Sequence, residues 1–461
     1  MNIKYLNLAS NVFIFGIGNL LVKVIQFFLL PIYTLYMSSS DYGIAELLKN
    51  YSEMLCPIVT LCIHEAVFRF VLEKEYMQSM ILNTALCANI IANILNIILM
   101  ILMSYFIEFQ YVNLLALIVL SYSFMTILGN YYKGLNNNKI YITGNLINSS
   151  SLFVFTIIFL EKLFFSINGY LMAIIAANIC SLIYYLYKLK IKISFQYNYN
   201  ILKSMLNFSF PLIINTLGWW GINTFSKYLI FYVLGSSIAG LFAAASKLPA
   251  VINTVAAIFQ QAWQISATQE YNKEDKNKFF TVVFSIYYAL VTTFAAFIIL
   301  INDNIAFLLL KRSFYEAKIY IPLLIFAMVF NCYSGYFSSL YIAIKSTRLL
   351  TMSTLVGLFV NILVSWSLIG KYGVWACIIA TVICYIIIIF IKYYYIRTDV
   401  ILDINIKKFC LIHILLFVEA LTISFDIGGF LNYLLFFVIL SLNMLANKAY
   451  IVKFAKNMLK Q

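Results

Sequence analysis

Residues 38–55 read SSSDYGIAELLKNYSEML, a turn-like start that leads into an apolar helix carrying charges. Glu46, Lys49 and Glu53 are spaced by three and four residues, so they share one helix face with Asn50. The chain on both sides of this stretch is apolar over long runs. A charge at the centre of a bilayer costs ~2.5–3.5 kcal/mol on insertion scales. Three such charges on one face therefore require an explanation.

The composition indicates an integral membrane protein. Of 461 residues, 64% are hydrophobic and 10% are charged, whereas soluble domains carry about 25% charged residues. The apolar runs reach the length of about 20 residues that crosses a bilayer as a helix. A transmembrane barrel would show short alternating segments instead. The first run ends near Met37, is too long for a signal-peptide core, and is expected to remain as a membrane helix.

We therefore predict an all-α integral membrane protein with about fourteen spanning helices. Each predicted helix is an apolar run bounded by polar or charged residues. The predicted ranges are 9–37, 43–71, 80–106, 112–134, 140–160, 168–189, 206–235, 239–267, 279–301, 318–344, 349–369, 373–395, 408–425 and 429–447.

The basic residues predict the orientation of these helices. Lys and Arg concentrate on the cytoplasmic side of membrane proteins. With the N-terminus inside, 22 of the 31 Lys and Arg residues fall on the cytoplasmic side and five fall outside. Both termini are therefore predicted to be cytoplasmic. The net charge of +14 follows from this bias and from attraction to anionic lipid, so we expect no nucleic-acid partner.

The remaining four basic residues lie inside predicted helices, in the first two helices of each six-helix half. Segments of the two halves resemble each other about 200 residues apart: 37–49 resembles 234–246, and 131–139 resembles 340–348. Because six is even, the halves insert as parallel repeats. We predict two parallel six-helix lobes around a central cavity, plus two C-terminal helices. The predicted parts are an N-terminal lobe at 1–190, a cytoplasmic linker at 191–205, a C-terminal lobe at 206–396, and the last two helices with a cytoplasmic tail at 397–461.

Cysteine and histidine give no sign of a metal site. The eight cysteines lie within or beside apolar runs and lack metal-ligand spacing, which is typical of small buried residues. His64 and His413 are far apart in the sequence. We expect no metal and no cofactor.

Two stretches carry a resemblance to a known family. LLPIYTLYMSSSDYGIAEL (29–47) resembles the N-terminal signature of polysaccharide-biosynthesis flippases. FPLIINTLGWWGINTFSKYLI (210–230), LGSSIAGLFAAASKLPAVI (234–252) and FQQAWQISA (259–267) are similar to their central signature. These are the Wzx-type oligosaccharide flippases, for O antigen or capsule, of the multidrug/oligosaccharidyl-lipid/polysaccharide (MOP) exporter superfamily. The resemblance covers about residues 10–395.

The resemblance implies a function and a location. It implies transport of undecaprenyl-pyrophosphate-linked oligosaccharide by alternating access, from the cytoplasmic to the outer leaflet of a bacterial cytoplasmic (inner) membrane. A polysaccharide polymerase is a further possible partner. Members typically have an Asp-Arg pair in helix 7, where this chain has Ser226-Lys227. The positive charge is kept and the acid is lost.

A lipid-linked sugar needs cations for its pyrophosphate and polar groups for its hydroxyls. The intramembrane lysines lie on polar helix stripes, which favours a hydrated cavity over lysines that merely snorkel or pair. Predicted substrate-binding residues are Lys23, Lys49, Lys227, Lys247, Gln26, Asn223 and Gln261.

The charged face of 38–55 has two possible interpretations. Lys49 could pair with both glutamates in a static clasp within its own helix. Alternatively, one carboxylate titrates as the substrate or a coupling ion, a proton or sodium, comes and goes. Four prolines fall in the charged helices, which are therefore expected to bend. Predicted coupling or gating residues are Glu46, Glu53, His64, Pro31, Pro57 and Pro249, with His64 five turns after Glu46 on one continuous face.

Other functions remain open on the sequence. A drug or metabolite exporter of the same superfamily would favour intramembrane acids, but predicted helices 7 to 12 have none. A lipid II-type flippase fits the fourteen helices. A membrane polysaccharide polymerase or ligase would place its catalytic residues in a sizeable outer loop, and the longest outer loop here, around 302–317, is short. We expect a transporter rather than an enzyme.

Overall fold

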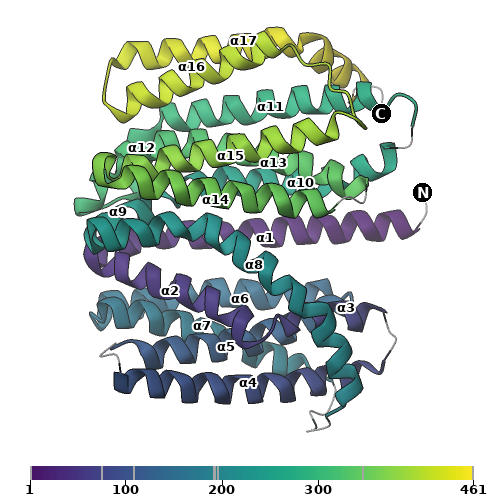
Figure 1. Cartoon of the computed structure of the whole chain (residues 1–461), viewed down its shortest axis with the longest axis vertical. Helices are drawn as coiled ribbons and strands as arrows, with labels where there is room; N and C mark the ends of the chain where they lie inside the picture. The colour runs from purple at the N-terminus through teal and green to yellow at the C-terminus, as the bar shows by residue number, and fades with distance from the viewer. Residues whose placement is uncertain are drawn as a thin grey trace. The chain divides into compact units, whose positions relative to one another are not determined.

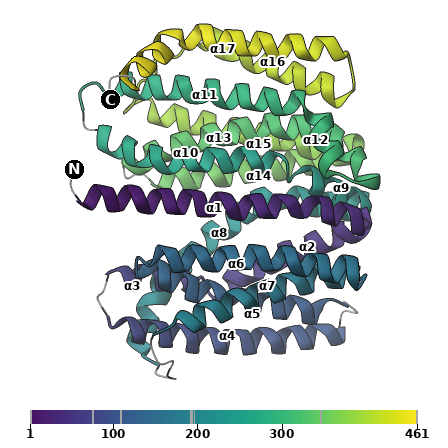
Figure 2. The same cartoon turned by 180° about the vertical axis from the view of Figure 1, so that it is seen from behind.

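The computed structural model describes residues 3–73, 76–106, 110–190, 194, 197–271, 273–344 and 347–458. Every regular element in these ranges is a helix (Figures 1 and 2). The elements are α1 (Ile3–Tyr36), α2 (Ser39–Val59), α3 (Ile63–Glu73), α4 (Gln78–Phe106), α5 (Val112–Gly134), α6 (Asn138–Ile157), η1 (Ile158–Lys162), α7 (Ser166–Lys188), α8 (Tyr199–Leu234), α9 (Ser236–Ala245), α10 (Pro249–Glu270), α11 (Lys276–Leu300), α12 (Asn302–Leu309), η2 (Arg312–Tyr320), α13 (Ile321–Ala343), α14 (Thr347–Tyr372), α15 (Val374–Ile396), α16 (Ile406–Ser424) and α17 (Gly429–Met458).

These elements confirm the all-α membrane fold class. Nine described helices are long and apolar enough to cross a membrane, or ten if the bent pair α2 and α3 is one span. When broken helices are joined, the elements overlap the fourteen predicted ranges one by one. The short helix α12 is additional, because it forms inside the predicted outer loop.

The helix α2 begins where its sequence dictates, but it ends earlier than the predicted helix 43–71. The Ser38 hydroxyl accepts a hydrogen bond from the backbone N–H of Asp41 at 3.0 Å, which satisfies one of the unpaired donors of the first turn. Asp41 also places a negative charge at the positive end of the helix dipole. Near the other end, Pro57 has no N–H, so the backbone oxygen of Glu53 lacks its helical donor. The helix stops at Val59, and α3 departs at 54°.

The chain divides into two compact units, Met1–Thr224 and Phe225–Gln461, called here the first and second unit. The division falls inside the single helix α8. The predicted lobe boundaries at 190 and 206, the linker between them and the central cavity stay predictions. Residues 191–193 and 195–196 of that linker lie outside the described residues.

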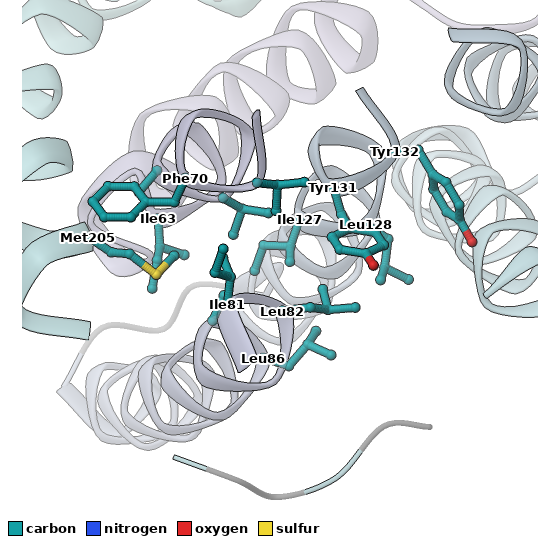
Figure 3. Packing of buried hydrophobic residues seen from close by; sticks show 14 of the residues in the cluster. Ile63, Phe70, Ile81, Leu82, Leu86, Ile127, Leu128, Tyr131, Tyr132 and Met205 are labelled. Atoms are coloured by element: carbon teal, nitrogen blue, oxygen red, sulfur yellow. The ribbon is translucent and has the colours of Figure 1, made fainter. Parts of the chain in front are cut away.

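The core of the first unit explains why the start of α8 belongs to it. Ile63 and Phe70 of α3 face Ile81 and Leu86 of α4, and Met205 of α8 packs into the same cluster (Figure 3). Residues of α5 complete the cluster, and they are Ile127, Leu128, Tyr131 and Tyr132. The first turns of α8 are therefore anchored to α3, α4 and α5.

Matching hydrogen bonds appear in both units and support the internal repeat. In the first unit, the Tyr132 hydroxyl donates to the backbone oxygen of Tyr185 at 2.9 Å. In the second, the Tyr341 hydroxyl donates to the backbone oxygen of Lys392 at 2.7 Å. Tyr132 and Tyr341 are aligned in the pair of segments 131–139 and 340–348. The fourth and sixth predicted helices of each half thus join in the same way.

The segments that follow these helices are also held in the same way. The backbone N–H of Ser194 donates to the Asn83 side chain of α4 at 3.2 Å. In the second unit, the N–H of Asp403 donates to the Thr281 hydroxyl of α11 at 3.0 Å. Each unit therefore ties the chain that leaves its last core helix back onto its third helix.

Buried polar groups and stacked rings hold helices together in both units. Helices α4 and α5 of the first unit share buried amide and hydroxyl groups, and Asn93 donates to the Asn89 and Ser123 side chains at 3.1 Å. The second unit stacks aromatic rings, with Trp263 lying 4.7 Å from the ring centroid of Tyr336. The last two helices, α16 and α17, pack together beside α11 (Figure 1).

Candidate functional site

The charged face of α2 runs from a buried acid to exposed charges. Glu46 is 1% exposed, while the side chains of Lys49 and Glu53 are 33% and 49% exposed. The Lys49 Nζ lies 3.4 Å from Glu53 Oε1, and Lys49 also interacts electrostatically with Glu46. Lys49 thus stands between two carboxylates, one enclosed and one open.

Three tyrosines surround the buried end of this face. Tyr33 of α1 and Tyr170 of α7 have ring centroids 4.9 Å apart, and Tyr42 of α2 lies 5.7 Å from Tyr33. All three are buried, and the Tyr42 phenol interacts with the Glu46 carboxyl. These phenols shield Glu46 from solvent. The sequence prediction did not include them, because α1, α2 and α7 come together only in the fold.

Lys23 adds a second cation on the open side. Its side chain is exposed, its Nζ lies 3.4 Å from the Gln26 Oε1, and it interacts electrostatically with Lys49 and Glu53. Tyr122 of α5 also interacts with Lys49 and Glu53. The structure therefore brings together the predicted residues of α1 and α2, and the group holds two lysines and two glutamates.

One contact fixes the backbone of this face. The Trp220 Nε1 of α8 donates to the backbone oxygen of Asn50 at 2.9 Å. Asn50 itself is buried, and its Nδ2 has no hydrogen-bond partner among the described residues. Asn223, one turn after Trp219, is exposed and donates to the backbone oxygen of Trp219.

The predicted residues of the second unit are more dispersed. Lys227 is half-buried on α8, and Lys247 is half-buried in the turn between α9 and α10. Pro249 is the first residue of α10. The Gln261 side chain lies outside the described part of the structure. The predicted helices that carry these two lysines, 206–235 and 239–267, contain no glutamate or aspartate.

The prediction that His64 continues the Glu46 face is wrong. Helix α2 ends at Val59, and Leu61 and Cys62 have φ angles of 49° and 53°, in the left-handed region. This turn interrupts the periodicity, so five turns of one helix no longer connect the two residues. His64 instead lies 3.7 Å from Glu65 on α3. Pro57 lies two residues before the end of α2, whereas Pro31 lies inside the continuous helix α1.

Lys392, one of the 22 basic residues that the sequence predicts on the cytoplasmic side, is buried in the second unit. Lys392 of α15 is 2% exposed. Its Nζ donates to the hydroxyls of Ser334 and Ser338 of α13, both at 2.8 Å, and to the Ser334 backbone oxygen at 3.3 Å. All three ammonium protons thus have oxygen acceptors, and no described carboxylate pairs with it.

The net charge of the group on α1 and α2 depends on the protonation of its carboxyls. The group of Lys23, Lys49, Glu46 and Glu53 has no net charge when all four are ionised, and it gains one positive charge when a carboxyl is protonated. A lysine released in this way can bind a phosphate oxygen. Among the described side chains, no three His, Cys, Asp or Glu residues come together as metal ligands.

The fold defines the class of protein. The chain is similar to lipid II flippase MurJ in an inward closed conformation, with a TM-score of 0.67 and 17% identity over 96% of this chain and 99% of that chain. The chain is also similar to an inward-facing multidrug resistance MATE family transporter of the MOP superfamily. The TM-score is 0.63, with 16% identity over 83% of this chain and 98% of that chain. A third similar structure is a MOP superfamily transporter from Pyrococcus furiosus. Its TM-score is 0.58, with 14% identity over 84% of this chain and 96% of that chain. The chain thus has the fold of these all-helical, multi-pass membrane proteins.

The sequence defines the family within that fold. Residues 8–264 match the family described as polysaccharide biosynthesis protein, and the chain belongs to this family. No curated protein matches the sequence. The matched range covers the charged face of α2, the N-terminal signature and all of the central signature except its last three residues, 265–267.

Proposed function

We propose that this protein is a flippase that moves undecaprenyl-pyrophosphate-linked oligosaccharide from the cytoplasmic to the outer leaflet by alternating access. The observation that carries the proposal is the group of Lys23, Lys49, Glu46 and Glu53 inside a member of the polysaccharide biosynthesis family. Phosphate needs cations, and here two lysines lie together beside two carboxylates within predicted membrane helices. A bacterial cytoplasmic membrane with both termini inside, and a polysaccharide polymerase acting on the product, complete the proposal.

Lys49 is proposed to exchange partners during transport. With both carboxylates ionised, Lys49 is held between Glu46 and Glu53. Protonation of one carboxyl removes a negative charge, and Lys49 together with Lys23 can then bind the pyrophosphate. Release of the proton restores the pairing and expels the phosphate. The coupling ion in this cycle is a proton, although sodium could neutralise the carboxylate in the same place.

The membrane potential can drive such a cycle. One elementary charge moved across 100 mV corresponds to ~2.3 kcal/mol, which is about a fiftyfold bias in an equilibrium constant at 1.4 kcal/mol per tenfold. A single proton exchanged at Glu46 per cycle is therefore sufficient to favour one direction.

Transport of lipid II is the second candidate, because the likeness to lipid II flippase MurJ extends over 96% of this chain and 99% of that chain. Lipid II shares the undecaprenyl pyrophosphate, so the same lysines serve both substrates. The glycan then distinguishes the two proposals.

Reconstituted vesicles test the proposal directly. Purified protein should translocate a fluorescent undecaprenyl-pyrophosphate oligosaccharide and leave a neutral polyprenyl glycoside of the same length behind. Equal translocation of the neutral lipid would contradict recognition of pyrophosphate. A preference for lipid II over all other glycans would select the second candidate.

A further inference from the structure

The helix α8 is shared by the two compact units. It is continuous over 36 residues from Tyr199 to Leu234, and the division between the units falls after Thr224. Its first turns are anchored in the core of the first unit through Ile201 and Met205. A contact that holds α8 near residue 224 therefore determines how a movement in the first unit is passed along the helix to Lys227. Lys227 lies less than one turn beyond the division.

Trp220 makes that contact. Its Nε1 donates to the Asn50 backbone oxygen at 2.9 Å, one turn before the division. The acceptor is the central residue of the charged face, because Asn50 follows Lys49 and lies between Glu46 and Glu53. A hydrogen bond to a backbone oxygen fixes the position of the helix itself rather than the rotamer of one side chain.

The part of α2 after Asn50, whose backbone oxygen accepts the Trp220 hydrogen bond, lacks some of the usual helical hydrogen bonds because of its own sequence. Pro57 has no N–H, so the backbone oxygen of Glu53 lacks its helical donor. The helix then breaks at Leu61 and Cys62. The Asn50 Nδ2 is buried and has no hydrogen-bond partner among the described residues, so it adds no anchor. The indole of Trp220 is thus a fixed external support just before the weak end of α2.

We infer that Trp220 is a positioning residue that couples the protonation state of the α2 face to α8. When Lys49 changes partner between Glu46 and Glu53, α2 shifts about its weak end, and the Trp220 bond carries this shift to the helix that continues into the second unit. This inference rests on the proposed function, since it requires a coupling carboxylate on α2. The other titratable side chains that interact with the face are Lys23 and Tyr33 of α1, Tyr42 of α2, Tyr122 of α5 and Tyr170 of α7.

Trp220→Phe is the decisive variant, because it removes the N–H and keeps an aromatic ring. Trp219→Phe is the matched control, since the Trp219 indole makes no hydrogen bond in the described structure. In vesicles, Trp220→Phe should translocate substrate with a pH dependence flattened at least threefold, as Glu46→Gln should, while Trp219→Phe should keep the parental profile. Trp220→His, whose ring N–H can donate, should restore part of the pH dependence.

Hydrogen exchange supplies a measurement that does not depend on transport. Trp220→Phe should raise amide exchange in residues 50–59 about tenfold and leave residues 39–46 unchanged. A parental pH profile in Trp220→Phe, together with an altered profile in Glu46→Gln, would overturn this inference alone. Parental profiles in both variants would overturn the coupling role on which it rests. Unchanged exchange in 50–59 would show that the bond does not support α2 and would also overturn the inference.

Discussion

The second membrane helix of each half is broken, but the two breaks differ. In the first unit, α2 and α3 meet at 54° through two left-handed residues, Leu61 and Cys62. In the second, α9 and α10 join through right-handed residues at Ser246–Leu248 and together still form one span. The first pair carries the acids and a lysine, whereas the second carries only Lys247 as an intramembrane charge. One architecture thus carries two acids and a lysine at this position in one half and a lysine without intramembrane acids in the other.

The difference teaches that charge and strain occur together. A left-handed turn costs roughly 1–2 kcal/mol per non-glycine residue, and strained backbone often lies at sites that move. The strained break follows the helix with the titratable face, and the unstrained break lies in the helix without one. This placement is expected if α2 is the helix that responds to protonation.

The largest expected effect contrasts Lys23 with Lys247. Lys23→Ala should abolish translocation, because it removes one of two cations beside the carboxylates, and Lys23→Arg should restore part of it. Lys247→Ala should reduce the rate only severalfold, since the predicted helices 7 to 12 of its half contain no acidic residue that could form a comparable group. The measurement is vesicle translocation at matched protein density, with exposed Lys203→Ala as a control.

Full translocation by the Lys23→Ala/Lys227→Ala double variant would contradict cation binding of the substrate in both halves. An equal loss in Lys23→Ala and Lys247→Ala would contradict the asymmetry between the halves.

The next effect contrasts Lys392 with Tyr185. The two residues correspond because their backbone oxygens accept the matching hydrogen bonds from Tyr341 and Tyr132. Removing both hydroxyls in Ser334→Ala/Ser338→Ala leaves a buried ammonium short of acceptors, and hydrogen bonds to charged groups are each worth about 1.5–3 kcal/mol. The midpoint temperature of thermal unfolding in detergent should therefore fall clearly. Tyr185→Phe loses one bond to the Tyr141 backbone oxygen and should cost about 1 kcal/mol.

A rescue variant identifies the cause. Adding Lys392→Met to the serine variant removes the buried charge, and the midpoint should recover most of its loss. If the triple variant is as unstable as the double variant, the hydroxyls stabilise the helix pair for a reason other than the ammonium.

The smallest effect concerns the breaks themselves. Leu61→Gly should raise stability by about 1 kcal/mol, because glycine adopts the left-handed region without steric cost. Ser246→Gly should lower it by about 0.5–1 kcal/mol, since Ser246 has a right-handed φ of −67°. Thermal unfolding of the two variants side by side checks the difference in sign; the same sign in both would remove the link between strain and the charged half.

Much of the fold could be predicted from the sequence, because hydropathy and length determine where a membrane helix can form. The shared face of Glu46, Lys49 and Glu53 also followed from spacing alone. The break at Leu61 and Cys62 could not, since no glycine marks the left-handed turn. Because this break was not predicted, the prediction that His64 shares a helix face with Glu46 was also wrong.

Tertiary packing accounts for the other features that were missed. The burial of Lys392 depends on serines of α13, and the enclosure of Glu46 depends on tyrosines of α1 and α7. Neither arrangement leaves a local pattern. A lysine near a helix end is ordinarily read as a cytoplasmic charge, so only the structure distinguishes Lys392 from its neighbours.

The central claim is that the α2 face couples transport to protonation, and the pH profile of Glu46→Gln tests it most directly. Glutamine mimics a permanently protonated Glu46, so translocation of the pyrophosphate-linked glycan should lose its pH dependence while folded protein is recovered in parental yield. Glu53→Gln should weaken the dependence as well. Glu73→Gln, which removes an exposed partner of Arg69, should leave it unchanged. If Glu46→Gln and Glu53→Gln both translocate with the parental pH profile, the face is a static clasp and the claim is wrong.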